Sequence, residues 1–275
     1  SAASDVYKRQ GDYDVKLETK SNFEIIRRVY SDFNHMVDEL NAVETLRNDF
    51  VSNVSHEFKT PLSSIEGYAM LLQDESLSAE ARSEYTERIV VSTRRLSTLV
   101  SNILMITKIE NQTMPFALSS YRVDEQVRQS ILLLENKWSE KNIGFEMDMD
   151  SIEFCAVEGL LGNVWSNLID NAIKFSPEGE IIYISLKEKD DMLSFKIANR
   201  GEPMSGETLK RIFEKFYQGD TSHKREGNGL GLALVKKIVR VHGGSVSAVN
   251  TEDGLIEFTV NLPAKRSCER YCGSN

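Results

Sequence analysis

The sequence has few cysteines and no long apolar run. Three cysteines among 275 residues cannot form the closed set of disulfide bonds that holds a small secreted protein together. No stretch approaches the roughly 18 consecutive apolar residues of a membrane span, and no signal peptide opens the chain. These shortages exclude a disulfide scaffold and predict a soluble chain.

Positive charge is also scarce. The 33 basic residues are outnumbered by 42 acidic ones, and a net charge of -9 repels a polyanion, so nucleic acid is not an expected partner. Any phosphate group must therefore be bound by local contacts. With 40% hydrophobic residues, the length suits about two domains, each with its own core.

Glycine and proline are nearly absent from residues 23–72, where only Gly67 and Pro61 occur. Apolar residues recur there at helical spacing, which predicts one very long helix. A heptad pattern follows the polar stretch 73–80, at Tyr85, Ile89, Ser92, Leu96, Leu99, Ile103 and Ile106. Two helices joined by a short turn form an antiparallel hairpin, and pairing of two hairpins into a dimeric four-helix bundle would bury both apolar stripes.

Beyond Pro115 the pattern changes to short β-rich runs between helical segments. Strands are expected at 180–187, 192–198, 245–250 and 256–262. A mixed α/β domain is therefore predicted after the helical part.

His56 falls off the apolar stripe of the first predicted helix, where its imidazole would meet solvent. Glu57 could orient the imidazole and accept its proton. Pro61 should bend the helix just beyond, because it cannot donate to the carbonyl four residues earlier. Thr60, one turn on, could position a water molecule or simply bond a backbone carbonyl. The alternative interpretation of His56 is a surface histidine without a catalytic role.

The stretch SHEFKTPL, residues 55–62, resembles the histidine box of sensor histidine kinases, with Phe58 as an apolar exchange. The resemblance implies that His56 is the phosphoryl acceptor and that Glu57 and Thr60 assist it.

A second stretch, NLIDNAIKFSP, resembles the asparagine box of the same kinases and of related ATPases such as Hsp90. Asn167 and Asn171 share one helical face, and an uncharged amide oxygen can share Mg²⁺ with a triphosphate. The resemblance implies ATP and Mg²⁺ as cofactors, with Asn171 as first metal ligand and Asn167 as second. Lys174 would neutralise phosphate and Phe175 would pack near the ribose or adenine. The alternative is a set of buried asparagines that satisfy backbone groups.

The run IANRGEPM stands where this family has its first glycine box, but departs from the family pattern. Asn199 replaces the family's aspartate, which accepts a hydrogen bond from the adenine amino group, and Pro203 replaces a glycine. An asparagine oxygen can still accept that hydrogen bond, or the amide could turn and donate instead. Gly201 would let the backbone approach the base.

Two further boxes complete the family order. IFEKFYQGD resembles the phenylalanine box that starts a lid over the nucleotide, with Phe213 and Phe216 docking it and Lys215 directed to the γ-phosphate. Gln218 stands where a second arginine is common. The second glycine box, which precedes a helix, would present backbone N–H groups to phosphates and comprises Gly227, Gly229, Leu230, Gly231 and Leu232.

The resemblance implies an α + α/β architecture, with a dimeric helical hairpin followed by an ATP-binding domain of the GHKL type. The expected divisions are a non-native-looking leader 1–10, a HAMP-like relay 11–45, a phosphoacceptor domain 46–112, a catalytic domain 116–264 and a tail 265–275.

The implied function is an ATP-dependent protein-histidine kinase that passes phosphate from His56 to an aspartate on a response regulator receiver domain and also acts as its phosphatase. The fragment would be the cytoplasmic portion of a membrane-anchored protein. Two alternatives remain open: a catalytically silent regulator-binding partner, and an Hsp90-like or MutL-like ATPase. The second alternative has no use for SHEFKTPL.

Overall fold

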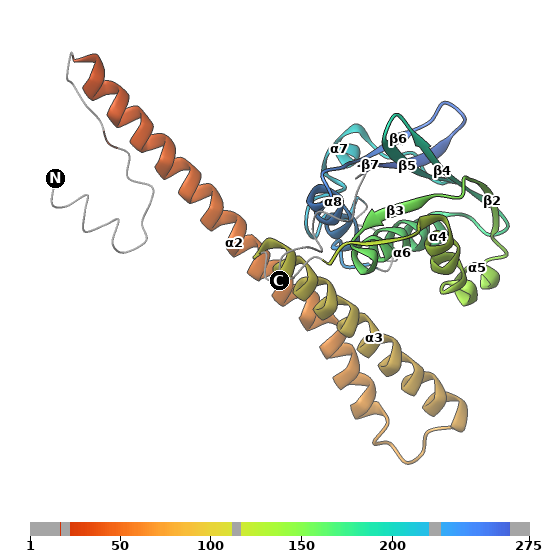
Figure 1. Cartoon of the computed structure of the whole chain (residues 1–275). Coiled ribbons are helices and arrows are strands. Elements are labelled where there is room, and N and C mark those ends of the chain that lie inside the picture. The colour runs from red at the N-terminus through yellow and green to blue at the C-terminus, as the bar shows by residue number, and fades with distance from the viewer. Residues whose placement is uncertain (1–16, 18–22, 112–116, 220–226, 265–275) are drawn as a thin grey trace. The chain divides into compact units, whose positions relative to one another are not determined.

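A computed structural model describes residues 17, 23–111, 117–219 and 227–264. The expected leader 1–10 and tail 265–275 lie outside the described residues. The chain divides into two compact units, residues 1–93 and 94–275. Figure 1 shows the elements of both.

The predicted long helix is confirmed as α2, Glu24–Leu71, a single helix of 48 residues. It continues through Pro61, which is buried. Near its start, the side chain of Asn34 exchanges two hydrogen bonds of 2.8 Å with the backbone N–H and carbonyl of Leu17. This contact ties the chain before the helix to the helix itself.

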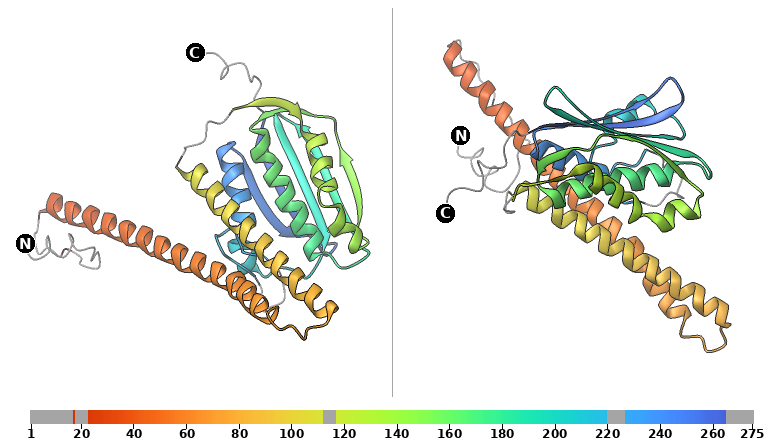
Figure 2. Two further views of the ribbon diagram at one scale, coloured as in Figure 1. Left: turned by 90° about the horizontal axis from the view of Figure 1, so that it is seen from below. Right: turned by 45° about the vertical axis from the view of Figure 1, so that its right-hand side comes forward.

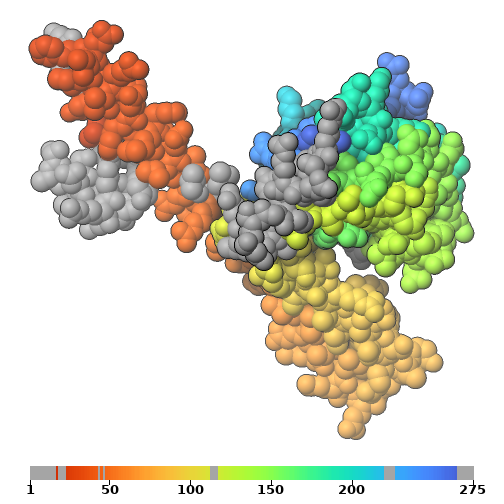
Figure 3. All heavy atoms as spheres, viewed as in Figure 1, coloured from red at the N-terminus to blue at the C-terminus, as the bar shows by residue number. Residues whose placement is uncertain are grey.

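The predicted hairpin is confirmed where α2 meets the beginning of α3, Ala79–Glu110. The rings of Tyr68 and Tyr85 lie 5.5 Å apart between centroids, and Ser92 Oγ lies 3.2 Å from Ser64 Oγ. Since the partner number falls as the α2 number rises, the two helices run antiparallel. Their side chains pack along one another in the space-filling view (Figure 3).

In the described part of the chain, α3 alone has the length and mean hydropathy of a membrane span. The sequence showed no uninterrupted run of that kind, because the average tolerates the serine, threonine and arginine residues within the helix. An apolar helix of a soluble bundle has the same composition.

The second unit is a layer of helices on a mixed sheet. Its remaining elements are β1 (Ser119–Arg122), α4 (Val123–Leu132), α5 (Glu135–Glu140), β2 (Gly144–Met149), β3 (Glu153–Ala156), α6 (Glu158–Phe175), β4 (Ile181–Lys189), β5 (Met192–Arg200), α7 (Gly206–Arg211), α8 (Gly231–Val241), β6 (Ser245–Asn250) and β7 (Leu255–Pro263). All four predicted strands are present, as β4, β5, β6 and β7.

The main sheet has the order β2-β4-β5-β7-β6, in which only the β2–β4 pair is parallel. Strands β1 and β3 form a separate antiparallel pair. Helices α4, α6 and α8 cover one face of the main sheet (Figure 2).

Along β4, β5 and β7, apolar side chains at alternate positions point to the face that the helices cover, where they are buried. In β7, Ile256, Phe258, Val260 and Leu262 are buried while their neighbours are partly exposed. Trp165 of α6 is fully buried, and its ring centroid lies 4.6 Å from that of Phe195 on β5. Each such side chain contributes about 1.5–3 kcal/mol on burial. The core therefore fixes α6 on the sheet and leaves its opposite face available.

A buried carboxylate joins the start of α4 to the segment before β3. Asp124, 2% exposed, accepts two hydrogen bonds from Arg122, at 2.8 and 2.7 Å, and one from the backbone N–H of Ile152 at 3.2 Å. The Arg122 hydrogen bonds are the main cause that lowers the pKa of Asp124 to about 2.

Candidate functional site

The helical unit presents an exposed histidine in the middle of α2. His56 and Thr60 are exposed, and Glu57 is half-buried. Thr60 Oγ1 donates a hydrogen bond of 3.4 Å to the carbonyl of His56, which is the backbone contact weighed above as the alternative to positioning water. The imidazole of His56 is thus accessible to a bulky phosphoryl donor.

Helix α6 of the second unit carries the two predicted metal-ligating asparagines. Asn167 Nδ2 donates a 2.7 Å hydrogen bond to the carbonyl of Asn163, which turns its Oδ1 away from that carbonyl. The side chain of Asn171, which is half-buried, makes no hydrogen bond within the described ranges. Both side chains therefore have an amide oxygen available as a hard, neutral ligand.

The beginning of α8 lies against Asn167. A Cβ atom on Gly231 would lie 2.6 Å from Asn167 Oδ1, so a larger residue there would require the Asn167 side chain to shift. The preceding Leu230 is fully buried, and its N–H donates to Asn228 Oδ1 at 3.2 Å. The N-terminal N–H groups of α8 thus begin beside the asparagine face of α6, an arrangement that favours an anion.

Two further predicted phosphate-site residues are also neighbours. A Cβ on Gly227 would lie 2.9 Å from Lys174 Nζ. Lys174 Nζ is also 4.7 Å from the centroid of the Phe175 ring. The structure therefore brings an ammonium group of α6 to the glycine-rich segment before α8.

The end of α6 is held by a residue that the sequence did not single out. Lys141 Nζ donates to the carbonyls of Ile173, Lys174 and Ser176, at 2.9, 2.8 and 3.1 Å. Last-turn carbonyls have no partner inside their helix, and a cation suits the negative end of the helix dipole. Lys141 thereby fixes the turn that carries Lys174 and Phe175.

Asn199 lies 2% exposed near the end of β5. Its Nδ2 donates a 2.9 Å hydrogen bond to the carbonyl of Arg200, which leaves its Oδ1 available as an acceptor. The carbonyl of Arg200 can only accept, so the amide nitrogen is the atom directed to it. Gly201 is packed closely, because a Cβ there would lie 3.1 Å from Ile256 Cδ1 and 3.5 Å from the carbonyl of Phe175.

The phenylalanine box is docked on the same unit. The Phe213 ring packs edge-on against Phe258 of β7 at 6.3 Å between centroids. Phe216 has a positive φ of 63°, and its N–H donates to the carbonyl of Gly229 at 2.9 Å. Gly229, with φ 64°, would carry a Cβ only 2.6 Å from the Phe216 carbonyl carbon. The phenylalanine and second glycine boxes are thus joined through their backbones.

Gln218 adds a hydrogen bond of 3.0 Å from its Nε2 to the carbonyl of Gly227. Lys215 lies elsewhere: its Nζ is 2.9 Å from Glu110 Oε1, and Lys237 Nζ is 3.7 Å from the same oxygen. In this structure the ammonium group of Lys215 is therefore paired with a carboxylate of α3, although the neighbouring Phe216 is bonded to Gly229. Leu232, in the first turn of α8, is half-buried.

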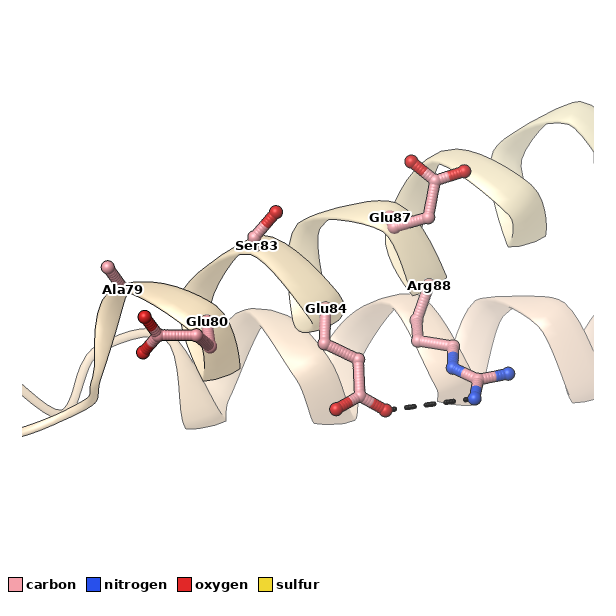
Figure 4. Close-up of a pocket in the computed structure, with 6 residues that line it drawn as sticks. All are labelled: Ala79, Glu80, Ser83, Glu84, Glu87 and Arg88. Atoms are coloured by element: carbon pink, nitrogen blue, oxygen red, sulfur yellow. Dashed lines mark ion pairs between the residues drawn. The ribbon is translucent and has the colours of Figure 1, made fainter.

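A shallow hollow on the first turns of α3 is unrelated to these residues. It is lined by Ala79, Glu80, Ser83, Glu84, Glu87 and Arg88, all from one helix (Figure 4). The ion pair between Glu84 and Arg88 spans 3.7 Å across it. Side chains of a single exposed helix do not converge on a ligand, so this hollow is not the candidate site.

Comparison with known families accounts for both units. Residues 46–112 match the His Kinase A (phospho-acceptor) domain, and residues 156–266 match the histidine kinase-, DNA gyrase B- and HSP90-like ATPase family. A phosphoacceptor hairpin followed by an ATPase domain of this kind defines the class. The chain belongs to the sensor histidine kinases.

Among individual proteins, the chain is 33% identical over 253 residues to the heme sensor protein HssS of Staphylococcus aureus strain JH9, which covers 92% of this chain and 54% of HssS. The chain thus spans about half the length of this relative. Two solved structures share the fold. Histidine kinase ThkA, in complex with the response regulator protein TrrA, has a TM-score of 0.65 at 23% identity, covering 84% of this chain and 65% of ThkA. Full-length ShkA with AMPPNP has a TM-score of 0.59 at 27% identity, covering 80% and 47%.

Proposed function

We propose that this chain transfers the γ-phosphoryl group of ATP to His56 and then to an aspartate of a response regulator receiver domain. The observation that carries the proposal is the pairing, in one chain, of an exposed imidazole on α2 with a phosphate-suited cradle formed by α6 and the start of α8. The ShkA complex with AMPPNP and the ThkA complex with TrrA support the nucleotide and the regulator by analogy.

In the acceptor step, a neutral ring nitrogen of His56 attacks the γ-phosphorus. The new P–N bond replaces the P–O bond to ADP, which leaves with the bond electrons. Glu57, the next residue on the helix, accepts the imidazole proton. Exposure of His56 gives the nucleotide domain access without unfolding of the helix.

In the nucleotide domain, the neutral oxygens of Asn171 and Asn167 suit Mg²⁺ because they add no negative charge beside a triphosphate. Bound Mg²⁺ would offset charge on the phosphate oxygens. Lys174 and the N–H groups at the start of α8 hold phosphate. Asn199 accepts from the adenine amino group through the oxygen that its bond to Arg200 leaves available.

The other predicted residues have supporting roles. Phe175, Phe213, Phe216 and Leu232 supply apolar contact around the nucleotide, and Gly201 allows the backbone to approach the base. Lys215 would reach a γ-phosphate only after it leaves Glu110, 2.9 Å away.

The same proposal includes a homodimer through the hairpin and an anchor in the membrane N-terminal to this fragment. Large apolar side chains remain exposed on the helical unit, namely Val51, Leu62, Met70, Leu71 and Val91. A second hairpin would bury them, as in a four-helix bundle. The expected divisions at 46–112 and 116–264 separate the acceptor from the nucleotide domain in this scheme.

Incubation of the purified chain with γ-labelled ATP and Mg²⁺ tests the proposal. The protein should gain phosphate that is labile in acid and stable in alkali, and should then pass it to a receiver domain. A catalytically silent partner, which Asn199, Pro203 and Gln218 favour, would bind the regulator without incorporating phosphate. An ATPase of the Hsp90 or MutL type would release phosphate without forming phosphohistidine.

The phosphatase activity has its own test in Thr60→Ala. Loss of the hydroxyl should slow decay of the phosphorylated regulator while phosphorylation of His56 persists, because only the phosphatase step needs a water positioned one turn from the histidine. Alanine is the better helix former, so the helix should remain intact. Full phosphatase activity in the variant would leave Thr60 with its bond to the His56 carbonyl alone.

A further inference from the structure

The side chain of Asn250, at the end of β6, is bonded to the backbone of a distant segment. The N–H of Met204 donates to Asn250 Oδ1 at 3.0 Å, and Asn250 Nδ2 donates to the carbonyl of Met204 at 2.8 Å. This exchange of two hydrogen bonds has the pattern of a paired residue in an antiparallel sheet. An amide side chain can replace a strand here because it carries both a donor and an acceptor.

Met204 belongs to the connection between β5 and α7, which begins directly after Arg200, the last residue of β5. Packing against Ile256 holds this connection at Gly201. At its other end Ser205 caps α7 by accepting from the N–H of Thr208 at 3.1 Å. The bonds from Asn250 hold the connection between these two points.

The sheet register places Asn250 level with Asn199. Ile256 of β7 is the register partner of Asn199 on β5 and also of Asn250 on β6. The two asparagines therefore lie in one row across three strands, on either side of Ile256.

A chain of contacts connects the two asparagines through the connection itself. Asn199 presents its oxygen because its Nδ2 is bonded to the carbonyl of Arg200. That carbonyl belongs to the last residue of β5 and leads into the connection 201–205, which Asn250 holds at Met204.

We propose that Asn250 is a positioning residue for recognition of the nucleotide base: by holding Met204, it keeps the Arg200 carbonyl in place, so that Asn199 offers an acceptor to the exocyclic amino group. The proposal rests on the proposed role of Asn199. Asn250 itself does not contact the base.

The test compares dissociation constants for ATP and for purine riboside triphosphate, which lacks the amino group, measured by calorimetry. The proteins are the unmodified chain, Asn250→Ala, Asn199→Ala and the double variant. Asn250→Ala should weaken ATP binding about three- to tenfold, as expected for two exposed hydrogen bonds, and leave the purine analogue nearly unchanged. The ratio of the dissociation constant for the purine analogue to that for ATP measures recognition of the amino group. In the Asn199→Ala background, Asn250→Ala should not change this ratio further, because both residues act on one contact.

Two variants sharpen the result. Asn250→Asp keeps the acceptor for the Met204 N–H and loses the donor, so its ratio should fall between those of the unmodified chain and Asn250→Ala. Asn136→Ala, an exposed asparagine on α5, is the matched control and should leave both constants unchanged. Thermal unfolding of each protein checks that the domain is folded.

Equal weakening of both nucleotides by Asn250→Ala would show a general structural role and overturn the proposal, as would an unchanged ATP constant. If Asn199→Ala lowers the ratio and Asn250→Ala does not, only the positioning role is wrong. If Asn199→Ala leaves the ratio unchanged, base reading by Asn199 is wrong and the positioning role falls with it.

Discussion

The acceptor segment and the nucleotide site are assembled in opposite ways. SHEFKTPL lies in eight consecutive residues of one helix, and the positions of His56 and Thr60 follow from helical periodicity alone. The proposed nucleotide site draws on α6, on β5 and on the start of α8, and Lys141 and Asn250 are proposed to support it through their hydrogen bonds. A local site can lose its chemistry without loss of stability, whereas an assembled site depends on contacts that also stabilise the fold.

The largest expected effect is at His56, where the comparison predicts loss of one activity alone. His56→Gln should abolish phosphate incorporation and leave ATP affinity unchanged, because the acceptor takes no part in the nucleotide cradle. Labelled ATP measures the first and calorimetry the second. The control is His35→Gln, at an exposed histidine of the same helix whose Nε2 lies 3.5 Å from Glu39 Oε1, and this variant should incorporate phosphate normally. Phosphate retained by His56→Gln would refute the assignment of the acceptor.

The second largest effect is expected for Asn171→Asp, which tests whether the assembled site needs an uncharged oxygen at this position. A carboxylate placed beside the triphosphate oxygens should repel them and lower the autophosphorylation rate about tenfold or more. The rate should be followed over a Mg²⁺ titration, with Asn136→Asp as the control. An unchanged Mg²⁺ dependence would remove Asn171 from the metal ligands.

Lys141→Met tests whether a contact that supports the assembled site also stabilises the fold. Losing three charge-assisted hydrogen bonds at the end of α6 should lower the free energy of unfolding by about 1–3 kcal/mol and weaken ATP binding as well. Urea unfolding measures the first effect. Lys189→Met, an exposed lysine at the end of β4, should change neither quantity. A Lys141→Met protein of unchanged stability would show that the capping bonds contribute nothing.

The smallest effect concerns pH. The pKa of Asp124 in the folded protein, about 2, lies below its ordinary value of 3.8. Its ionised form therefore stabilises the fold, fully above about pH 4, and this contribution is lost as the pH falls toward 2. Asp124→Asn should cost about 2 kcal/mol at neutral pH, and its deficit in urea unfolding should shrink between pH 4 and 2. An equally large deficit at both ends of that range would contradict this source of stability; the exposed Asp253→Asn is the control.

The sequence predicted those features whose signals are local. The apolar spacing of residues 23–72 predicted α2 to within one residue at each end, and short β-rich runs predicted β5 and β6. Strands β1 and β3, of four residues each, are too short to show a period.

The sequence did not reveal the proposed supporting residues, Lys141 and Asn250, because their hydrogen-bond partners are distant in the sequence. Lys141 precedes the carbonyls it binds by more than 30 residues, and Asn250 follows Met204 by 46. Nothing beside a lone lysine or asparagine reveals such a partner. The same reason explains Lys215, whose neighbour Glu110 lies 105 residues earlier in the chain.

The close approach of Gly231 to Asn167 limits the order in which this protein can evolve. Asn167 is already bonded to the Asn163 carbonyl, so it cannot turn aside for a methyl group at position 231 without losing that bond. A larger residue at 231 therefore costs that bond or requires a smaller residue at 167, and either change disturbs an oxygen of the proposed metal site. Descendants that keep ATP should therefore keep both residues, while lineages that have given up the nucleotide are free to change both.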